Sequence, residues 1–144
     1  MSQVLVHIHG LLPYLFLPLM LVTLVMTGSA LSSGNLSKRG ISLARVVMIL
    51  AHVQFLFGIL LLAFGEKAKL LANGMGPVMQ NASARLSLVE HPTMMLIGIV
   101  LITVGFVRSK KTEDGKTKAK RIFIPYAIGL ILILSRIPYT EWFS

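Results

Sequence analysis

Four long apolar stretches occupy most of the chain and limit what it can fold into. They cover residues 3–28, 42–64, 84–108 and 122–140. Each is close to the length of about 20 mostly apolar residues that one helix needs to cross the hydrocarbon core of a bilayer. Charged residues make up only 13% of the chain, far below the share in soluble domains. The sequence therefore predicts an all-α integral membrane protein, with a single transmembrane domain over residues 1–144.

Basic side chains lie mainly in the connections between these stretches. The last connection, residues 108–121, holds seven Lys or Arg against two acidic residues, and the first adds Lys38, Arg39 and Arg45. The middle connection is nearly balanced. By the positive-inside rule, the first and last connections face the cytoplasm and both termini face the periplasm of a bacterium. We therefore expect a multi-pass protein of the bacterial inner membrane, and we attribute the net charge of +9 to topology and not to a nucleic-acid partner.

Short connections favour antiparallel neighbours, so the simplest architecture is an up-down four-helix bundle. The middle connection, residues 65–83, is longer and half apolar, and we expect it to form a partly ordered flap on the outer side. Asn81 or Ser83 is available there as the cap of the third helix.

All four histidines lie inside or at the edge of an apolar stretch. Ionisable groups are costly within a membrane and tend to be functional there. His7 and His9 are about 200° apart on a helix, so only one of them readily points inward. We expect this to be His9, with His7 as an interfacial polar side chain. His52 lies roughly 18 Å from the outer end of its helix, near the middle of the bilayer, either as a ligand of a metal centre or in a structural hydrogen bond.

The segment that begins the third stretch combines a histidine, a proline and two glycines. His91, Gly98 and Gly105 are spaced by seven residues and therefore share one stripe of a helix. The glycines either let another helix approach closely or clear space for a flat ligand. Pro92 kinks the helix if the helix begins near Ala84, and the carbonyl freed by the break is then available to orient a histidine ring.

Three inward histidines on three helices predict axial ligation of haem iron in the core of the bundle. The chain has no cysteine, which excludes thiolate iron–sulfur clusters and cysteine-bound zinc. The candidate metal ligands are His91 together with His9 or His52. His9 and His91 match in depth, at about 9 and 10 Å from the outer helix ends, but a tilt brings His52 level as well, so the second ligand stays open.

Further side chains complete the candidate cofactor site. Arg136 lies at the depth of His9 and His91, where it either neutralises haem propionates or anchors the end of its helix. Gly98 belongs to the site if the glycine stripe makes room for the haem. Glu90 is expected to pair with Arg85 at the surface in preference to carrying protons.

Four segments resemble a known family. They are HIHGLLPYLFL, AHVQFLFGILLL, VEHPTMMLIGIVLITVG, and the basic loop followed by IFIPYAIGLILILSRIPY. Together they resemble the small four-helix bacterial membrane proteins catalogued as cytochrome B, over nearly the whole chain. The resemblance implies a haem-b protein for electron transfer, whose histidines correspond to His9, His52 and His91. Pro13 and Tyr14 stand where the family pattern has an Arg–Trp pair.

The leading hypothesis is a b-type cytochrome that binds haem b between its helices. It would be an electron carrier or redox subunit more than a stand-alone enzyme, with a quinol or a redox protein as its partner, and it would form part of a larger complex or a homo-oligomer. One alternative is a cofactor-free structural or accessory subunit of a larger membrane complex. A proton or metal-ion conduit through the three histidines ranks last because no carboxylate lies at mid-membrane.

Overall fold

A computed structural model describes residues 1–143 of the chain, and every regular element in that range is helical. Ser144, the last residue of the predicted domain, lies outside the described residues. The elements are α1 (Ser2–Ser33), α2 (Lys38–Phe64), α3 (Ala68–Leu71), α4 (Met75–Gln80), α5 (Ala82–Arg85), a π-helical turn (Leu86–Glu90), α6 (His91–Ser109), α7 (Gly115–Ser135) and α8 (Tyr139–Trp142). The predicted all-α class is confirmed.

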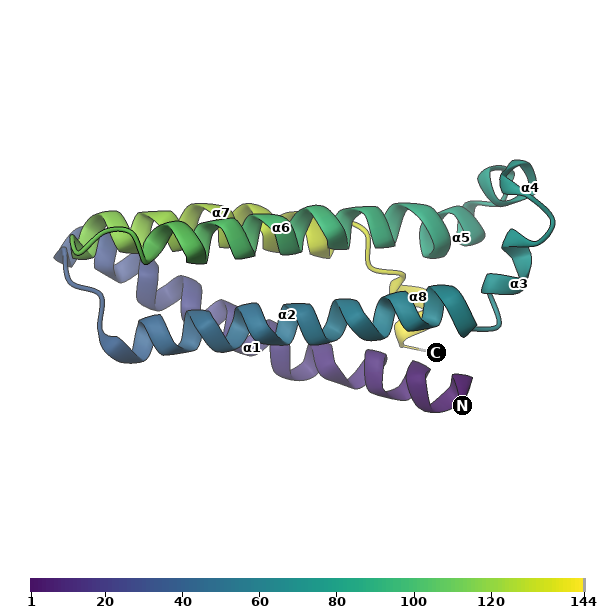
Figure 1. Cartoon of the computed structure of the whole chain (residues 1–144), viewed down its shortest axis with the longest axis horizontal. Helices are drawn as coiled ribbons and strands as arrows, with labels where there is room; N and C mark the ends of the chain where they lie inside the picture. Colours follow the sequence, from purple (N-terminus) through teal and green to yellow (C-terminus); the bar gives the residue numbers. More distant parts are fainter. Residues whose placement is uncertain (144) are drawn as a thin grey trace.

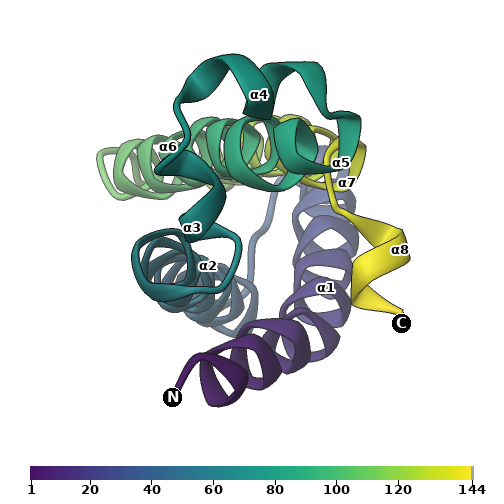
Figure 2. The same cartoon turned by 90° about the vertical axis from the view of Figure 1, so that its right-hand side faces the viewer.

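The four long helices α1, α2, α6 and α7 lie side by side and pack in chain order (Figure 1). α1 packs on α2, α2 on α6, α6 on α7, and α7 returns to α1. α1 and α6 therefore occupy opposite corners, as do α2 and α7. The short helices α3, α4 and α5 cross the end of the molecule that also carries both termini (Figure 2).

Three of the helical segments are long and apolar enough to cross a membrane. They are Ser2–Ser33, Lys38–Phe64 and Ala82–Ser109, where the last comprises α5, the π-helical turn and α6. α7 is not among them because its first two turns contain Lys116, Lys118, Lys120 and Arg121. Its apolar part, residues 122–135, amounts to roughly 21 Å of helix, which is shorter than the hydrocarbon core.

The first connection is much shorter than the sequence predicts. α1 continues to Ser33, five residues beyond the predicted end, and polar side chains of its last turns bond back to the helix backbone. Thr27 donates to the carbonyl of Thr23 at 2.8 Å, and Ser32 to that of Ser29 at 3.1 Å. The helix ends where Gly34 adopts a φ of 74°, a left-handed conformation that suits glycine.

The last long helix ends earlier than the sequence predicts. α7 stops at Ser135 and not near residue 140, since the residue before Pro138 is kept out of the helical conformation by the proline ring. The chain then turns and forms α8, which lies beside α1 (Figure 2). This early end leaves backbone carbonyls of the last turn without helical partners.

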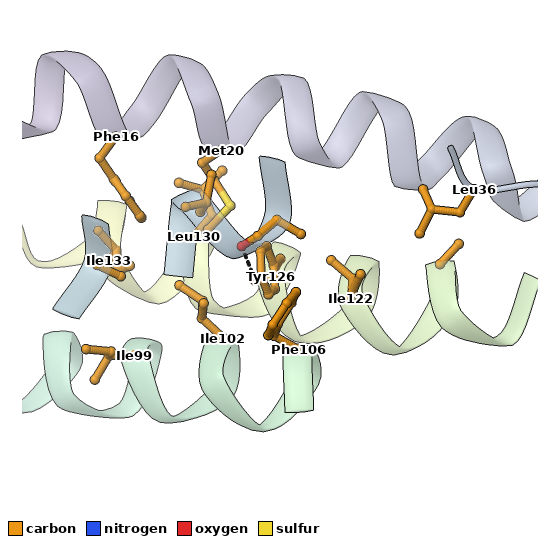
Figure 3. Packing of buried hydrophobic residues seen from close by; sticks show 14 of the residues in the cluster. Phe16, Met20, Leu36, Ile99, Ile102, Phe106, Ile122, Tyr126, Leu130 and Ile133 are labelled. Atoms are coloured by element: carbon orange, nitrogen blue, oxygen red, sulfur yellow. Dashed lines mark hydrogen bonds between the residues drawn. The ribbon is translucent and has the colours of Figure 1, made fainter. Parts of the chain in front are cut away.

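The main apolar core fills the half of the molecule near the α1–α2 and α6–α7 connections. Its fully buried side chains include Val47. Met20, Ile102, Phe106 and Tyr126 are also fully buried and are seen together in Figure 3. The Tyr126 hydroxyl donates to the carbonyl of Ala44 at 2.7 Å, which satisfies this buried polar group and ties α7 to α2.

Toward the other end the close packing stops. None of the residues 1–15 of α1 or 52–64 of α2 is buried. A second, smaller apolar cluster lies under the short helices and consists of Val78, Ala84 and Leu88, with Leu62, Leu71 and Val89 against it. The predicted outer flap is thus ordered into short helices over its own small core. Asn81 caps α5, as expected, because its side chain accepts from the amide of Ala84 at 3.0 Å.

Candidate histidine site

His91 sits at the join between a π-helical turn and α6. Pro92 lacks an amide hydrogen, so an unbroken α-helix through it would leave a carbonyl without its partner. The turn Leu86–Glu90 widens the helix by one residue, and the amide of His91 bonds to the carbonyl of Leu86, five residues earlier. The interruption expected at Pro92 therefore takes the form of a π-helical turn, which sets the direction of the His91 side chain.

The His91 ring is held by the end of α7. Its Nδ1 lies 2.9 Å from the carbonyl oxygen of Arg136, the residue that follows the last turn of that helix. A carbonyl only accepts, so Nδ1 carries the proton and Nε2 keeps its lone pair. The orienting carbonyl thus comes from α7 and not, as the sequence led us to expect, from the carbonyl freed beside Pro92 in the same helix.

His9 faces His91 from the opposite corner of the molecule. The two ring centroids are 6.1 Å apart and the ring planes are at 89°. His9 also rests on α2, where the absence of a side chain at Gly58 makes room for the ring, because a Cβ there would lie 3.2 Å from its Cε1. The diagonal helices α1 and α6 therefore meet through these two imidazoles.

Gln54 of α2 connects directly to His9. Its amide nitrogen donates to the carbonyl of His9 at 2.8 Å and lies 3.2 Å from Nδ1 of the same residue. Its Oε1 is buried and has no hydrogen-bond partner among residues 1–143. An unsatisfied buried amide oxygen costs about 1–3 kcal/mol, which marks this contact as one of functional interest.

Charged side chains lie next to the pair. The Glu90 carboxylate is 2.9 Å from Nε of Arg85 and 3.5 Å from Nε of Arg136. The expected pairing of Glu90 with Arg85 is confirmed, and Arg136 joins it. All three side chains are about one third to one half exposed, so the contribution of each pair to stability is small.

His52 does not join the other two histidines. Its side chain is exposed, with Nδ1 donating to the carbonyl of Met48 at 2.8 Å and Nε2 lying 3.4 Å from Oγ1 of Thr103. It lines a groove of about 330 Å³ between α2 and α6, whose other lining residues are apolar except for Thr103. The structure therefore does not bring His52 together with His9 and His91, and its role as a metal ligand stays a prediction. His7 is exposed and bonds to the carbonyl of Gln3, as befits an interfacial side chain.

Gly98 lies in a helix contact. A Cβ at Gly98 would be 2.9 Å from Cγ1 of Ile133, and a Cβ at Gly105 would be 2.7 Å from the carbonyl oxygen of Arg121. Of the two explanations for the glycine stripe, the structure supports close packing of α6 on α7. The space beside Gly98 is filled by α7.

The C-terminal tail is a part of the site that the sequence did not reveal. Trp142 of α8 donates from Nε1 to the carbonyl of Gly10 at 2.8 Å, next to His9. Glu141 bonds to Lys67 and to the hydroxyls of Ser83 and Ser87, and so ties the tail to the short helices. Burial raises the pKa of Glu141, but the hydrogen bonds and charge of Lys67 and the two serines lower it more, so it lies below the ordinary value of 4.5.

The donor set in this region is small. Within residues 1–143, no group of three or more His, Cys, Asp or Glu side chains is arranged to hold a metal ion. The site instead offers two imidazoles, with Gln54 and the Arg136 carbonyl as their hydrogen-bond partners. A comparison of the chain with protein families, curated proteins and solved structures finds no match.

Proposed function

We propose that the chain is a membrane electron-transfer protein of the b-type cytochrome kind, in which His9 and His91 would hold one haem. The observation that carries the proposal is the pair of imidazoles that face each other from diagonal helices, with centroids 6.1 Å apart. Imidazole nitrogens bind a transition metal at about 2 Å, so two histidines that would hold one metal group must have their rings close together. The 6.1 Å between the two ring centroids is short enough for this role.

The donor set supports haem over a metal ion bound by the protein alone. Two histidines leave a bare ion with too few ligands, whereas a porphyrin supplies the remaining nitrogens and needs only axial ligands from the protein. The haem would supply one-electron redox chemistry. The chain's own residues would bind it and orient the two rings.

The two histidine rings differ in which ring nitrogen their hydrogen bonds leave free to bind a metal. His91 donates through Nδ1, which leaves Nε2 available as a ligand, as is usual for metal-bound histidines. His9 instead accepts at Nδ1 from Gln54. A half-turn of the Gln54 amide would bring its buried, partnerless Oε1 to Nδ1, so that His9 could also donate there, at the cost of the bond to the His9 carbonyl.

The proposal includes the membrane topology. All four long helices would cross the bacterial inner membrane as an up-down bundle, with α7 relying on its basic first turns to reach the cytoplasmic surface. Both termini and the histidine pair would then lie on the periplasmic side, with Trp142 and Tyr139 in the interfacial aromatic belt. Electrons would pass between a quinol or redox protein and another acceptor, within a larger complex or a homo-oligomer.

Substitution of the histidines tests the haem hypothesis. We expect His91→Ala and His9→Ala to lose at least most of the haem per mole of purified protein, measured from oxidised and reduced absorption spectra and from iron content. His52→Ala is the matched control and is expected to retain haem, because its side chain points away from the pair. A wild-type protein without haem, expressed in cells that make haem, contradicts the hypothesis.

A second function is favoured by the hydrogen bonds themselves. Gln54 with His9 joins α2 to α1, and His91 with Arg136 joins α6 to α7, and neither bond needs a cofactor. These bonds suit a structural or accessory subunit of a larger membrane complex. In that case the wild-type protein binds no haem, and His91→Ala lowers its thermal stability without any spectral change.

A further inference from the structure

A groove of about 640 Å³ runs along the surface between α1 and α2, at the end of the molecule far from the histidine pair. It is lined by Met26 of α1 and by Lys38, Arg39, Ser42, Leu43 and Val46 of α2. The polar lining residues are the first ones of α2, and Leu43 and Val46 follow them along the helix. The open groove is therefore lined by basic and polar residues near the start of α2 and by apolar residues further along the helix.

The two cations near the start of α2 have no acidic partner. Neither Lys38 nor Arg39 forms an ion pair with any residue in the described part of the chain, and both are exposed. Two neighbouring positive charges attract an anion, and the hydroxyl of Ser42 adds a hydrogen-bonding group one turn further along.

The apolar walls of the groove indicate which kind of anion would bind there. A free phosphate or a soluble acidic peptide would leave the walls formed by Met26, Leu43 and Val46 uncovered, whereas one acyl chain covers them. Exposed apolar residues continue the same surface on both helices, at Val22 and Ile49. An amphiphile with a negative headgroup matches both the charge and the apolar surface.

The other basic connection does not offer the same arrangement, although it carries more charge. Lys110 lies 5.0 Å from the centre of the Phe106 ring, and Arg121 donates to the carbonyl of Arg108 at 2.9 Å. Lys110 and Arg121 therefore already make contacts within the protein. The number of basic residues alone would have predicted anion binding at this connection and not at the groove.

We infer that the groove between α1 and α2 binds one anionic phospholipid, with its phosphate at Lys38 and Arg39 and an acyl chain along Leu43 and Val46. This lipid site is independent of the histidine pair and of any haem.

The test uses the full-length protein in a mild detergent at physiological salt. Native mass spectrometry measures the binding of phosphatidylglycerol and, as the zwitterionic comparison, of phosphatidylcholine with the same acyl chains. We expect one phosphatidylglycerol to be retained preferentially. The double variant Lys38→Gln/Arg39→Gln should bind it about 30-fold more weakly, since each basic residue near a lipid surface contributes on the order of 1 kcal/mol.

Two further variants test whether lipid binding depends on the groove itself or only on the number of basic residues. Lys116→Gln/Lys120→Gln removes the same two charges from the other connection, where both side chains are exposed, and should change the affinity less than about threefold. Val46→Trp keeps the charge and fills the groove, and should weaken binding as the acyl chain loses its place. Equal binding of the two lipids, or an equal loss of binding in both double variants, would overturn the inference. Stabilisation of the protein by glycerol phosphate alone would overturn it as well, because it would show an anion site that needs no acyl chain.

Discussion

Gly98 and Gly105 show how single residues set the distance between two helices. Both face α7, but their neighbours differ in kind. At Gly98 the nearest atom is Cγ1 of the Ile133 side chain, whereas at Gly105 it is the backbone carbonyl oxygen of Arg121, with Pro125 beside it. A side chain can move aside, but a backbone carbonyl and a proline ring inside a helix cannot.

The glycine contacts predict unequal costs for the same substitution. Gly105→Ala should lower the free energy of unfolding by about 1–3 kcal/mol, the usual cost of overpacking, and Gly98→Ala by clearly less. Gly76→Ala is the control because no atom lies within 4 Å of a Cβ there. Thermal unfolding of the detergent-solubilised protein measures all three, and a larger loss at Gly98 than at Gly105 would contradict the argument.

At the scale of elements, the tail helix α8 joins parts of the chain that are distant in sequence. Trp142 bonds to α1 and Glu141 bonds to Lys67 beside the short helices. α8 therefore links these elements at the end of the molecule that holds His9 and His91. Trp142 is the only tryptophan in the sequence, and its fluorescence therefore reports whether the tail is docked.

Docking of the tail should depend on pH through Glu141. Its pKa is lowered in the folded protein, so its stabilising effect is complete above the ordinary value of 4.5 and is lost as the pH falls below that value through the folded pKa. We expect the Trp142 emission to shift to the red in that acid range. Glu141→Gln should remove most of this transition while costing at most about 1 kcal/mol at neutral pH, because the pair with Lys67 is partly exposed. A transition unchanged in Glu141→Gln would assign it to another group.

The elements also show what a single sequence can and cannot predict here. Hydrophobic length predicted where the long helices lie, and residue depth indicated that His9 and His91 lie at the same level, where the structure brings their rings to 6.1 Å. The end of α7 was misplaced because Pro138 lies within an apolar run that reads as one span. The outward direction of His52 and the contact of Gln54 with His9 depend on how the helices are rotated against each other, which the spacing of one sequence does not determine.

For the whole molecule, the main question is which end faces which side of the membrane. The packing places the tail and the short helices α3, α4 and α5 at one end, and the α1–α2 and α6–α7 connections at the other (Figure 1). The second end carries ten of the fourteen basic residues, so in the proposed topology, which follows the positive-inside rule, it would face the cytoplasm.

The absence of cysteine makes the topology directly testable. Single cysteines introduced as Asn73→Cys, between α3 and α4, and Asn35→Cys, between α1 and α2, are a matched pair of exposed positions at opposite ends. A membrane-impermeant maleimide on intact cells should label Asn73→Cys, and should label Asn35→Cys only after permeabilisation. Thr140→Cys in the tail should behave like Asn73→Cys if α7 crosses the membrane. Labelling of Thr140→Cys only after permeabilisation would mean that α7 does not cross, and that the contact of Glu141 with Ser83 and Ser87 does not form in the membrane.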